Sequence, residues 1–167
     1  MILRDISADV IEPVTLKEVK DQIGYAEGNT FNDDYLTRNI TAMRQLLEGA
    51  IGRVIVPREF EIIPDPAVIN PPTPLIEVLS FTAEDNRGNM EEVEYEISGS
   101  PQAPLIHWCA SHKNNVRLVV RCGMDPVPEA ISSCIVDLVK ARYDRVPLDP
   151  VLDDCVKVCQ PYRRMRL

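Results

Sequence analysis

The sequence has few aromatic residues and few glycines, and it contains none of the common glycine-rich phosphate motifs. Aromatic side chains make up 5% of its 167 residues, and only seven residues are glycine. Neither G-x-G-x-x-G nor the Walker pattern G-x-x-x-x-G-K occurs, which argues against a dinucleotide or nucleoside triphosphate site. G-x-S-x-G and H-E-x-x-H are also missing, so the signatures of a serine hydrolase and a zinc peptidase are not present.

Long apolar runs are missing too. The first ten residues, M-I-L-R-D-I-S-A-D-V, lack the apolar centre and small-residue cleavage site of a signal peptide, and no later run could span a membrane. The five cysteines are an odd number and have no framework spacing, which is typical of a reducing compartment. We therefore expect a protein without membrane association that is made in the cytoplasm of its host.

Positive charge is scarce except at the C-terminal end. The net charge is −8, which excludes the basic footprint of a general nucleic-acid-binding protein. Residues 145–167 nevertheless carry five basic and three acidic side chains, which leaves −10 for the rest of the chain. A basic tail on an acidic body suits binding to an acidic partner or to a neighbouring subunit.

Three segments have the pattern of helices. Thr15 and Glu18 form a capping box for a helix over 15–24, which ends at Gly24. A longer helix over 33–52 carries an apolar stripe at spacings of three and four residues, with Asn32 or Asp33 as its cap. Pro128 fits the first turn of a third helix over 128–144. The stripe of the second helix consists of Leu36, Ile40, Met43, Leu47 and Ile51.

The middle of the chain has the pattern of strands. Arg58–Pro64 alternates apolar and charged residues, as a half-buried strand does. Leu75–Ser98 indicates a strand, a turn near Asn86–Asn89 and a second strand. Pro104–Cys109 and Asn115–Cys122 are two further candidates. These segments predict a small antiparallel β region over about 54–122, inserted between the second and third helices.

The resulting expectation is an α+β protein, a small helical bundle of three main helices with an inserted antiparallel β region and an extended C-terminal arm. We assign 1–145 to a single domain and 146–167 to the arm, within which a short helix around Val151–Val158 fits the pattern. Fourteen prolines mark the connections, and Pro147, Pro150 and Pro161 lie within the arm, before its last six residues. No internal repeat is present.

Candidate chemical groups are sparse. His107, Cys109 and His112 could be imagined as metal ligands, but a zinc site needs four ligands. Adjacent carboxylates such as Asp153 and Asp154 point in different directions and suit a solvated surface better than a catalytic pair. We therefore expect no catalytic residues, no metal and no cofactor, and keep a small metal-binding accessory enzyme as the alternative.

The last six residues are the candidate binding segment. Arginines alternate there with apolar side chains, and Arg and Tyr are typical interface anchors. Preceding prolines reduce the entropy lost when an extended arm becomes ordered. The alternative is a solvated chain end. The predicted binding residues are Tyr162, Arg163, Arg164, Met165, Arg166 and Leu167.

The order of several motifs resembles that of the head–tail connector family of tailed phages, also called head-completion or adaptor proteins, with related copies in prophages and gene transfer agents. V-T-L-K-E-V-K at Val14–Lys20, D-D-Y-L at Asp33–Leu36 and E-G-A-I-G-R at Glu48–Arg53 match the family's opening. R-C-G-M-D-P-V-P-E-A-I at Arg121–Ile131 resembles the start of its third helix. The long β insertion, and the end of that helix as Ala141–Arg145, depart from the family pattern.

The resemblance implies a structural virion protein with no catalysis. Such proteins form a ring, usually a dodecamer, in the neck beneath the portal protein, where double-stranded DNA passes through the lumen without sequence-specific binding. The C-terminal segment would dock on the portal, and a stopper or tail-completion protein would bind below. A stopper role for this chain itself stays open. An acidic wall would repel the passing duplex rather than retain it.

Overall fold

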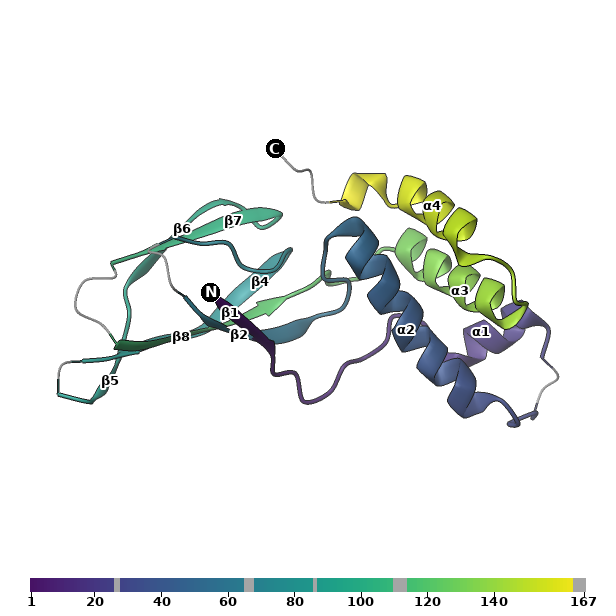
Figure 1. The fold of residues 1–167 in the computed structure, drawn as a ribbon, viewed down its shortest axis with the longest axis horizontal. Coiled ribbons are helices and arrows are strands. Elements are labelled where there is room, and N and C mark those ends of the chain that lie inside the picture. The colour runs from purple at the N-terminus through teal and green to yellow at the C-terminus, as the bar shows by residue number, and fades with distance from the viewer. Residues whose placement is uncertain (26–27, 65–67, 86, 110–113, 164–167) are drawn as a thin grey trace. The chain divides into compact units, whose positions relative to one another are not determined.

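The computed structural model describes residues 1–25, 28–64, 68–85, 87–109 and 114–163. The chain forms two compact units. The sheet unit comprises Met1–Val10 and Val56–Asp125, and the helical unit comprises Ile11–Ile55 and Pro126–Leu167. Figure 1 shows the strands in the first unit and the helices in the second. The predicted α+β class is confirmed.

The described part of the helical unit contains four helices and one 3-10 turn. Helices α1 (Leu16–Ile23), α2 (Asp33–Ile51) and α3 (Glu129–Tyr143) lie within one residue of the predicted boundaries. Residues 148–158 of the predicted arm are helical, as α4 (Leu148–Val158), which begins three residues before the short helix expected there and precedes η1 (Gln160–Tyr162). The division into a domain at 1–145 and an arm at 146–167 stays a prediction.

Local signals fix most helix ends. The hydroxyl of Thr15 accepts a hydrogen bond from the Glu18 amide at 3.2 Å, and the Glu18 carboxylate accepts one from the Thr15 amide at 2.6 Å, so the capping box is present. Gly24 and Gly52 adopt the left-handed conformation that ends α1 and α2. Asn32, one of the two predicted caps, occupies the cap position of α2, but its side chain makes no capping hydrogen bond, because its amide donates to the Tyr25 hydroxyl instead.

The core of the helical unit forms where α2 and α3 face each other. The five residues of the predicted α2 stripe are at most 4% exposed, which confirms the face that the spacing indicated. Helix α3 contributes Ile131, Ile135, Leu138 and Val139, all fully buried. Burying one such side chain contributes about 1.5–3 kcal/mol, so this face accounts for much of the unit's stability.

The sheet unit contains two antiparallel sheets. The first has the order β1–β2–β8–β4–β5, and the second has the order β3–β7–β6. The strands are β1 (Ile2–Asp5), β2 (Arg58–Ile63), β3 (Val68–Ile69), β4 (Leu75–Glu84), β5 (Met90–Glu92), β6 (Tyr95–Ser100), β7 (Ala103–Trp108) and β8 (Asn114–Cys122). The β region is therefore larger than the predicted insertion, because β1 at the start of the chain also joins it.

Buried residues of the two sheets make one core. Alternate residues of β2 and β8, such as Phe60, Ile62, Leu118 and Val120, are buried on one face of the larger sheet. The rings of Phe81 on β4 and Trp108 on β7 meet edge to face, with their centroids 5.6 Å apart, and so join the two sheets. Trp108 therefore lies on the central strand of the smaller sheet.

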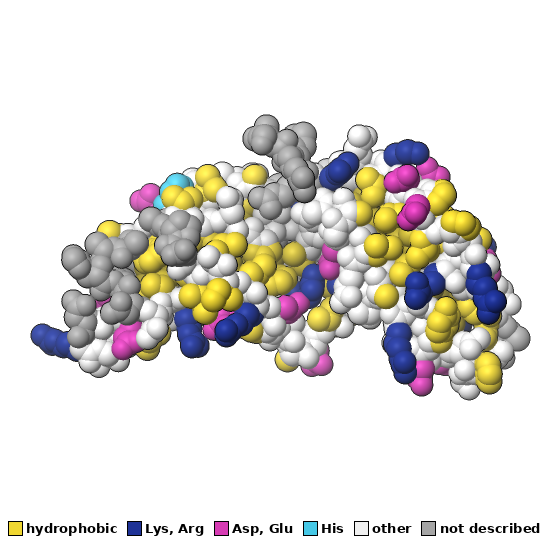
Figure 2. Space-filling view, in the orientation of Figure 1, with side chains coloured by type: hydrophobic (Ala, Val, Ile, Leu, Met, Phe, Trp, Pro, Cys, Tyr) yellow, Lys and Arg dark blue, Asp and Glu magenta, His cyan; other side chains and the backbone are white. Residues whose placement is uncertain are grey.

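Both units keep apolar side chains on their surfaces, as Figure 2 shows. The most exposed are Phe31 at 89% and Ile11 at 85% in the helical unit. In the sheet unit they include Ile2, Leu3 and Met90, each about half exposed. Within the described residues no helix combines the length and the apolar character that a membrane crossing requires.

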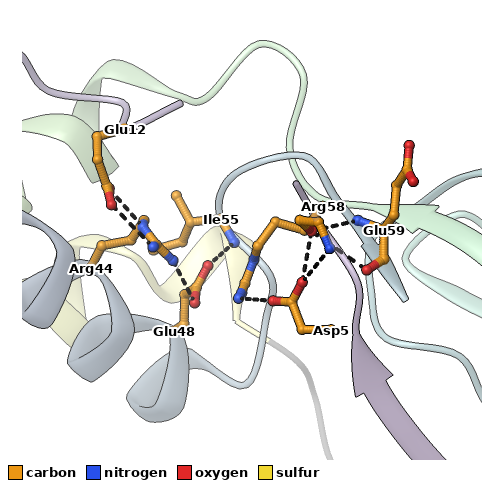
Figure 3. Close-up of polar contacts among 8 residues, drawn as sticks. Asp5, Glu12, Arg44, Glu48, Ile55, Arg58 and Glu59 are labelled. Carbon is orange, nitrogen blue, oxygen red and sulfur yellow. Dashed lines mark hydrogen bonds and ion pairs between the residues drawn. The ribbon is translucent and has the colours of Figure 1, made fainter. Parts of the chain in front are cut away.

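An almost fully buried arginine holds the start of the helical unit to α2. The Arg44 side chain is 2% exposed, and its guanidinium donates to Glu12 at 2.7 Å and 3.1 Å and to Glu48 at 3.1 Å. The second oxygen of Glu48 accepts from the Ile55 amide at 2.8 Å. Figure 3 shows that Arg44 lies between the two carboxylates. The cluster thus fixes the segment before α1 and the turn after α2.

Candidate binding surface at the C-terminal end of the chain

The C-terminal helix packs on α3 through three cysteines. The Cys159 and Cys134 sulfurs are 3.9 Å apart, and the Cys155 thiol lies 3.6 Å from the Cys134 carbonyl oxygen. All three side chains are buried. Burial raises the pKa of the Cys159 thiol to about 12 and also raises that of Cys155. The Cys155 and Cys159 thiols therefore stay uncharged, and the three buried cysteines act as small apolar packing groups.

The turn η1 is held to the end of α2 by an arginine. The Arg53 Nε donates to the Tyr162 carbonyl oxygen at 3.2 Å, and the Arg53 residue is only 9% exposed. Within the turn, the Tyr162 amide donates to the Cys159 carbonyl at 2.9 Å, and the Arg163 amide donates to the Gln160 carbonyl at 3.2 Å. A desolvated guanidinium on a backbone carbonyl makes a strong hydrogen bond. The backbone at Tyr162 is therefore held against the end of α2.

Two of the six predicted binding residues lie at this point. Tyr162 is half-buried against the helical unit, and Arg163 is exposed beside it. The other four, Arg164, Met165, Arg166 and Leu167, lie outside the described residues. The candidate binding segment thus begins at Tyr162, which Arg53 holds in place, and continues with the exposed cation of Arg163.

The acidic side chains nearest in sequence lie on α4. Lys157 pairs with Asp154 at 2.8 Å, with both side chains about three-quarters exposed, and Asp149 lies in the first turn. Exposed pairs of this kind add little to stability, because water and salt screen them. Asp154 pairs with Lys157, and the Arg163 side chain is exposed to contact with another molecule.

The alternative metal site lacks a described ligand set. The His107 ring lies 2.8 Å from the Ser98 hydroxyl, across the β6–β7 pair. Cys109 is exposed, and His112 lies outside the described residues. Among the residues with a described position, no group of three or more His, Cys, Asp or Glu side chains could hold a metal ion. The metal alternative therefore gains no support.

Arg53 is the functional candidate that sequence reasoning missed. It ends the E-G-A-I-G-R motif, but its partner Tyr162 is 109 residues further along the chain. The available sequence signal was Gly52. A glycine after a helical pattern often adopts a left-handed conformation, as Gly52 does, and the next residue then turns away from the helix axis. A single sequence contains no signal that joins two positions so far apart.

We expect Arg53→Met to loosen η1 while the helical core stays intact. The substitution keeps an apolar stem but removes the donor to the Tyr162 carbonyl, which costs about 1.5–3 kcal/mol of local stability. Hydrogen exchange at the Tyr162 and Arg163 amides should become at least tenfold faster. Arg163→Ala, which removes the neighbouring exposed cation, is the matched control and should leave the Tyr162 amide unchanged. Unchanged exchange in Arg53→Met would contradict the assigned anchor role.

Comparison with known proteins gives a fold match without a close relative. No protein-family model and no curated protein matches the chain. A chain in the virion of a native gene transfer agent (GTA) particle is similar with a TM-score of 0.76 at 15% identity. Chains in the neck of an empty GTA particle computed with C6 symmetry and of a native GTA particle computed with C12 symmetry give TM-scores of 0.75 and 0.65, at 15% and 14% identity. Each match covers 100% of this chain and 97% of the other, so the likeness shows the fold along the full length.

Proposed function

We propose that this protein is a structural, non-enzymatic neck component of a tailed-phage-like particle, and that it is the adaptor ring beneath the portal. The observation that carries the proposal is the full-length match, over both units, to chains in GTA neck structures. The order of sequence motifs supports the same role independently. In this role the protein is located in the virion neck, with assembly in the host cytoplasm.

The symmetry of the matched particles favours twelve copies over six. Every chain in a neck computed with C12 symmetry recurs twelve times around the axis, and a twelve-copy ring also satisfies C6. A six-copy ring would satisfy only C6. Because the family resemblance gives the adaptor a twelve-copy ring, we prefer an adaptor to a stopper, and place the stopper or tail-completion protein among the partners. Double-stranded DNA would pass through the lumen, where the net charge of −8 disfavours retention.

The oligomeric state with the portal tests the proposed function. The full-length protein, mixed with its portal protein, should give a complex containing twelve copies of the 18.8 kDa chain. Native mass spectrometry and electron microscopy of the complex measure the copy number. Six copies would overturn the twelve-copy adaptor ring, and a monomer that does not bind the portal and binds stoichiometric zinc would overturn the neck assignment.

We further propose that Tyr162–Leu167 dock on the portal, with Arg53 setting where the segment begins. Deleting 162–167 should leave the fold intact and abolish portal binding in a pull-down. Deleting 164–167 alone is the matched variant, because it keeps the carbonyl that Arg53 contacts. If the 162–167 deletion binds the portal as well as the intact chain does, the docking role is wrong.

Charge reversal separates electrostatic docking from apolar docking. Arg163→Glu with Arg164→Glu should weaken portal binding more at low salt than at high salt, because screening at about 1 M salt shortens the reach of charge to about 3 Å. Equal losses at both salt concentrations would assign the contact to Tyr162, Met165 and Leu167 instead. Surface plasmon resonance at two ionic strengths makes the comparison.

A further inference from the structure

The two outer strands of the five-stranded sheet are exposed at every residue. Strands β1 and β5 have no buried position, whereas their neighbours β2 and β4 bury several residues. No other described strand pairs with their outer sides. Soluble proteins usually protect such edges with proline, lysine or a bulge, because an open edge pairs with other chains. Neither strand contains a proline or a lysine, and neither ladder has a bulge. Both strands are short and carry charged side chains, which discourage indiscriminate pairing, so a strand that pairs with them must match their charges. Strand β1 also carries the half-exposed Ile2 and Leu3.

Strand β1 is held firmly in place by polar contacts at its end. The Asp5 carboxylate accepts hydrogen bonds from the Ser7 hydroxyl at 2.7 Å, the Ser7 amide at 3.1 Å and Arg58 at 2.9 Å. The Ser7 hydroxyl in turn accepts from the Glu59 amide at 3.0 Å. Figure 3 shows Asp5 at the centre of these contacts. The edge is therefore preformed, which lowers the entropy cost of pairing with another strand.

Backbone directions follow from two hydrogen bonds. The Ile6 amide donates to the Glu59 carbonyl of β2 at 3.0 Å. In an antiparallel ladder, every second residue directs its amide and carbonyl toward the neighbouring strand. The amides and carbonyls of Leu3 and Asp5 therefore point away from β2, out of the sheet. On the other edge the Val93 amide donates to Phe81 at 2.9 Å, so the groups of Met90 and Glu92 point outward. Each edge thus has two residues, spaced two positions apart, whose backbone amides and carbonyls point out of the sheet.

We propose that the β1 edge of one copy pairs in parallel with the β5 edge of the next copy, so that adjacent subunits share one continuous sheet. All neighbouring strands are antiparallel, and four steps separate β1 from β5, so the two edge strands run in the same direction. A copy displaced sideways therefore presents β1 parallel to β5. The same step repeats from copy to copy, which is the head-to-tail contact that closes a ring. This inference rests on the proposed ring.

One register satisfies both charge and apolar contacts. With Leu3 opposite Glu91, Leu3 lies between the outward groups of Met90 and Glu92, and about three main-chain hydrogen bonds can form. Ile2 then faces Met90, which is 55% exposed, and Arg4 faces Glu92. The Arg4 side chain is 61% exposed and only 3.5 Å from Glu61, so it can bridge both carboxylates.

Other registers fit less well. A shift of two residues in one direction brings Asp5 opposite Glu91, and two like charges then face each other across the junction. The opposite shift places Ile2 against Glu92 and loses the apolar pair. A two-fold contact of β1 with a second β1 would give a dimer that cannot extend to a ring. The charge pattern therefore selects β5 of another copy as the occupant of the β1 edge.

A charge exchange tests the register. Arg4→Glu and Glu92→Arg should each weaken the association of full-length copies by roughly 3–10-fold per contact, and the double variant should restore it. Arg117→Glu is the matched control. Arg117 is also 61% exposed and also pairs with Glu61, at 3.4 Å, but it lies on the interior strand β8. Loss of association in this control, or no recovery in the double variant, would overturn the register.

Proline at Leu3 tests the backbone contact itself. The Leu3 amide points away from β2, so Leu3→Pro removes an outward donor without breaking the β1–β2 ladder. We expect the thermal melting curve of the sheet unit to be retained and ring association to fall more than tenfold. Rings that form normally from folded Leu3→Pro protein would overturn the proposal.

Cross-linking tests the β1–β5 contact separately from the formation of a ring. In a Cys109→Ser background, Ile2→Cys with Met90→Cys should give a ladder of multimers with a short bismaleimide, whereas either cysteine alone should stay monomeric, because the proposed contact then has a cysteine on one side only. Portal-bound rings that yield no ladder would overturn the edge contact and leave the proposed function intact. Failure to form any ring with the portal would overturn both.

Discussion

Replacing Arg44 with methionine is expected to lower the free energy of unfolding by about 3–5 kcal/mol. The guanidinium is almost fully buried and makes three hydrogen bonds to Glu12 and Glu48, whose side chains are 19% and 10% exposed. Without it, two carboxylates remain close together and poorly hydrated. Burial of unpaired charge, rather than loss of packing volume, therefore causes the loss of stability.

Urea unfolding of the intact chain measures this effect. Arg38→Ala is the matched control, because Arg38 is an exposed arginine on the same helix. Its substitution should change stability by no more than about 0.5 kcal/mol. Adding Glu12→Gln to Arg44→Met should recover part of the loss, since it removes one uncompensated charge. A double variant less stable than Arg44→Met would contradict this explanation.

Helices could be predicted closely because their signals are local. The α2 stripe and the Thr15–Glu18 box each lie within a few turns of chain, and Gly24 and Gly52 end their helices through their own backbone conformation. Asn32 lies at the predicted cap position, but its side chain makes no capping hydrogen bond, because its amide donates to Tyr25, a tertiary partner that helix propensity does not include. Local signals therefore predict the boundaries of the helices better than they predict the hydrogen-bond partner of each side chain.

Strand β1 could not be predicted because its stability depends on a distant strand. Ile2–Asp5 has no apolar alternation, and its partner residues lie in β2, as the pairing of Arg4 with Glu61 shows. The same reason applies at the C-terminal end, where Arg53 meets Tyr162. The basic composition of the last residues was visible in the sequence. The anchor that positions them depends on contacts across the folded unit.

Replacing Gly123 with alanine is the second large effect that we expect, a loss of about 2–5 kcal/mol in the free energy of unfolding. Gly123 directly follows β8 and has a φ of +145°, which side-chain-bearing residues rarely adopt. An added Cβ would lie 2.5 Å from the Val56 carbonyl oxygen and 2.6 Å from the Pro57 backbone. The Gly123 amide also donates to Pro74 at 2.9 Å, so the backbone cannot shift without losing a hydrogen bond.

This glycine belongs to the R-C-G-M-D-P-V-P motif, and the close backbone contact supplies a physical reason for it. Gly49→Ala is the matched control, since Gly49 lies within α2 with no atom inside 4 Å of the added Cβ. That change should raise stability by about 0.5–1 kcal/mol, because alanine favours a helix over glycine. Chemical denaturation of both variants makes the comparison. Because the clash is with backbone atoms of Val56 and Pro57, shortening neighbouring side chains should not rescue Gly123→Ala, and a loss below about 1 kcal/mol would show that the turn can relax.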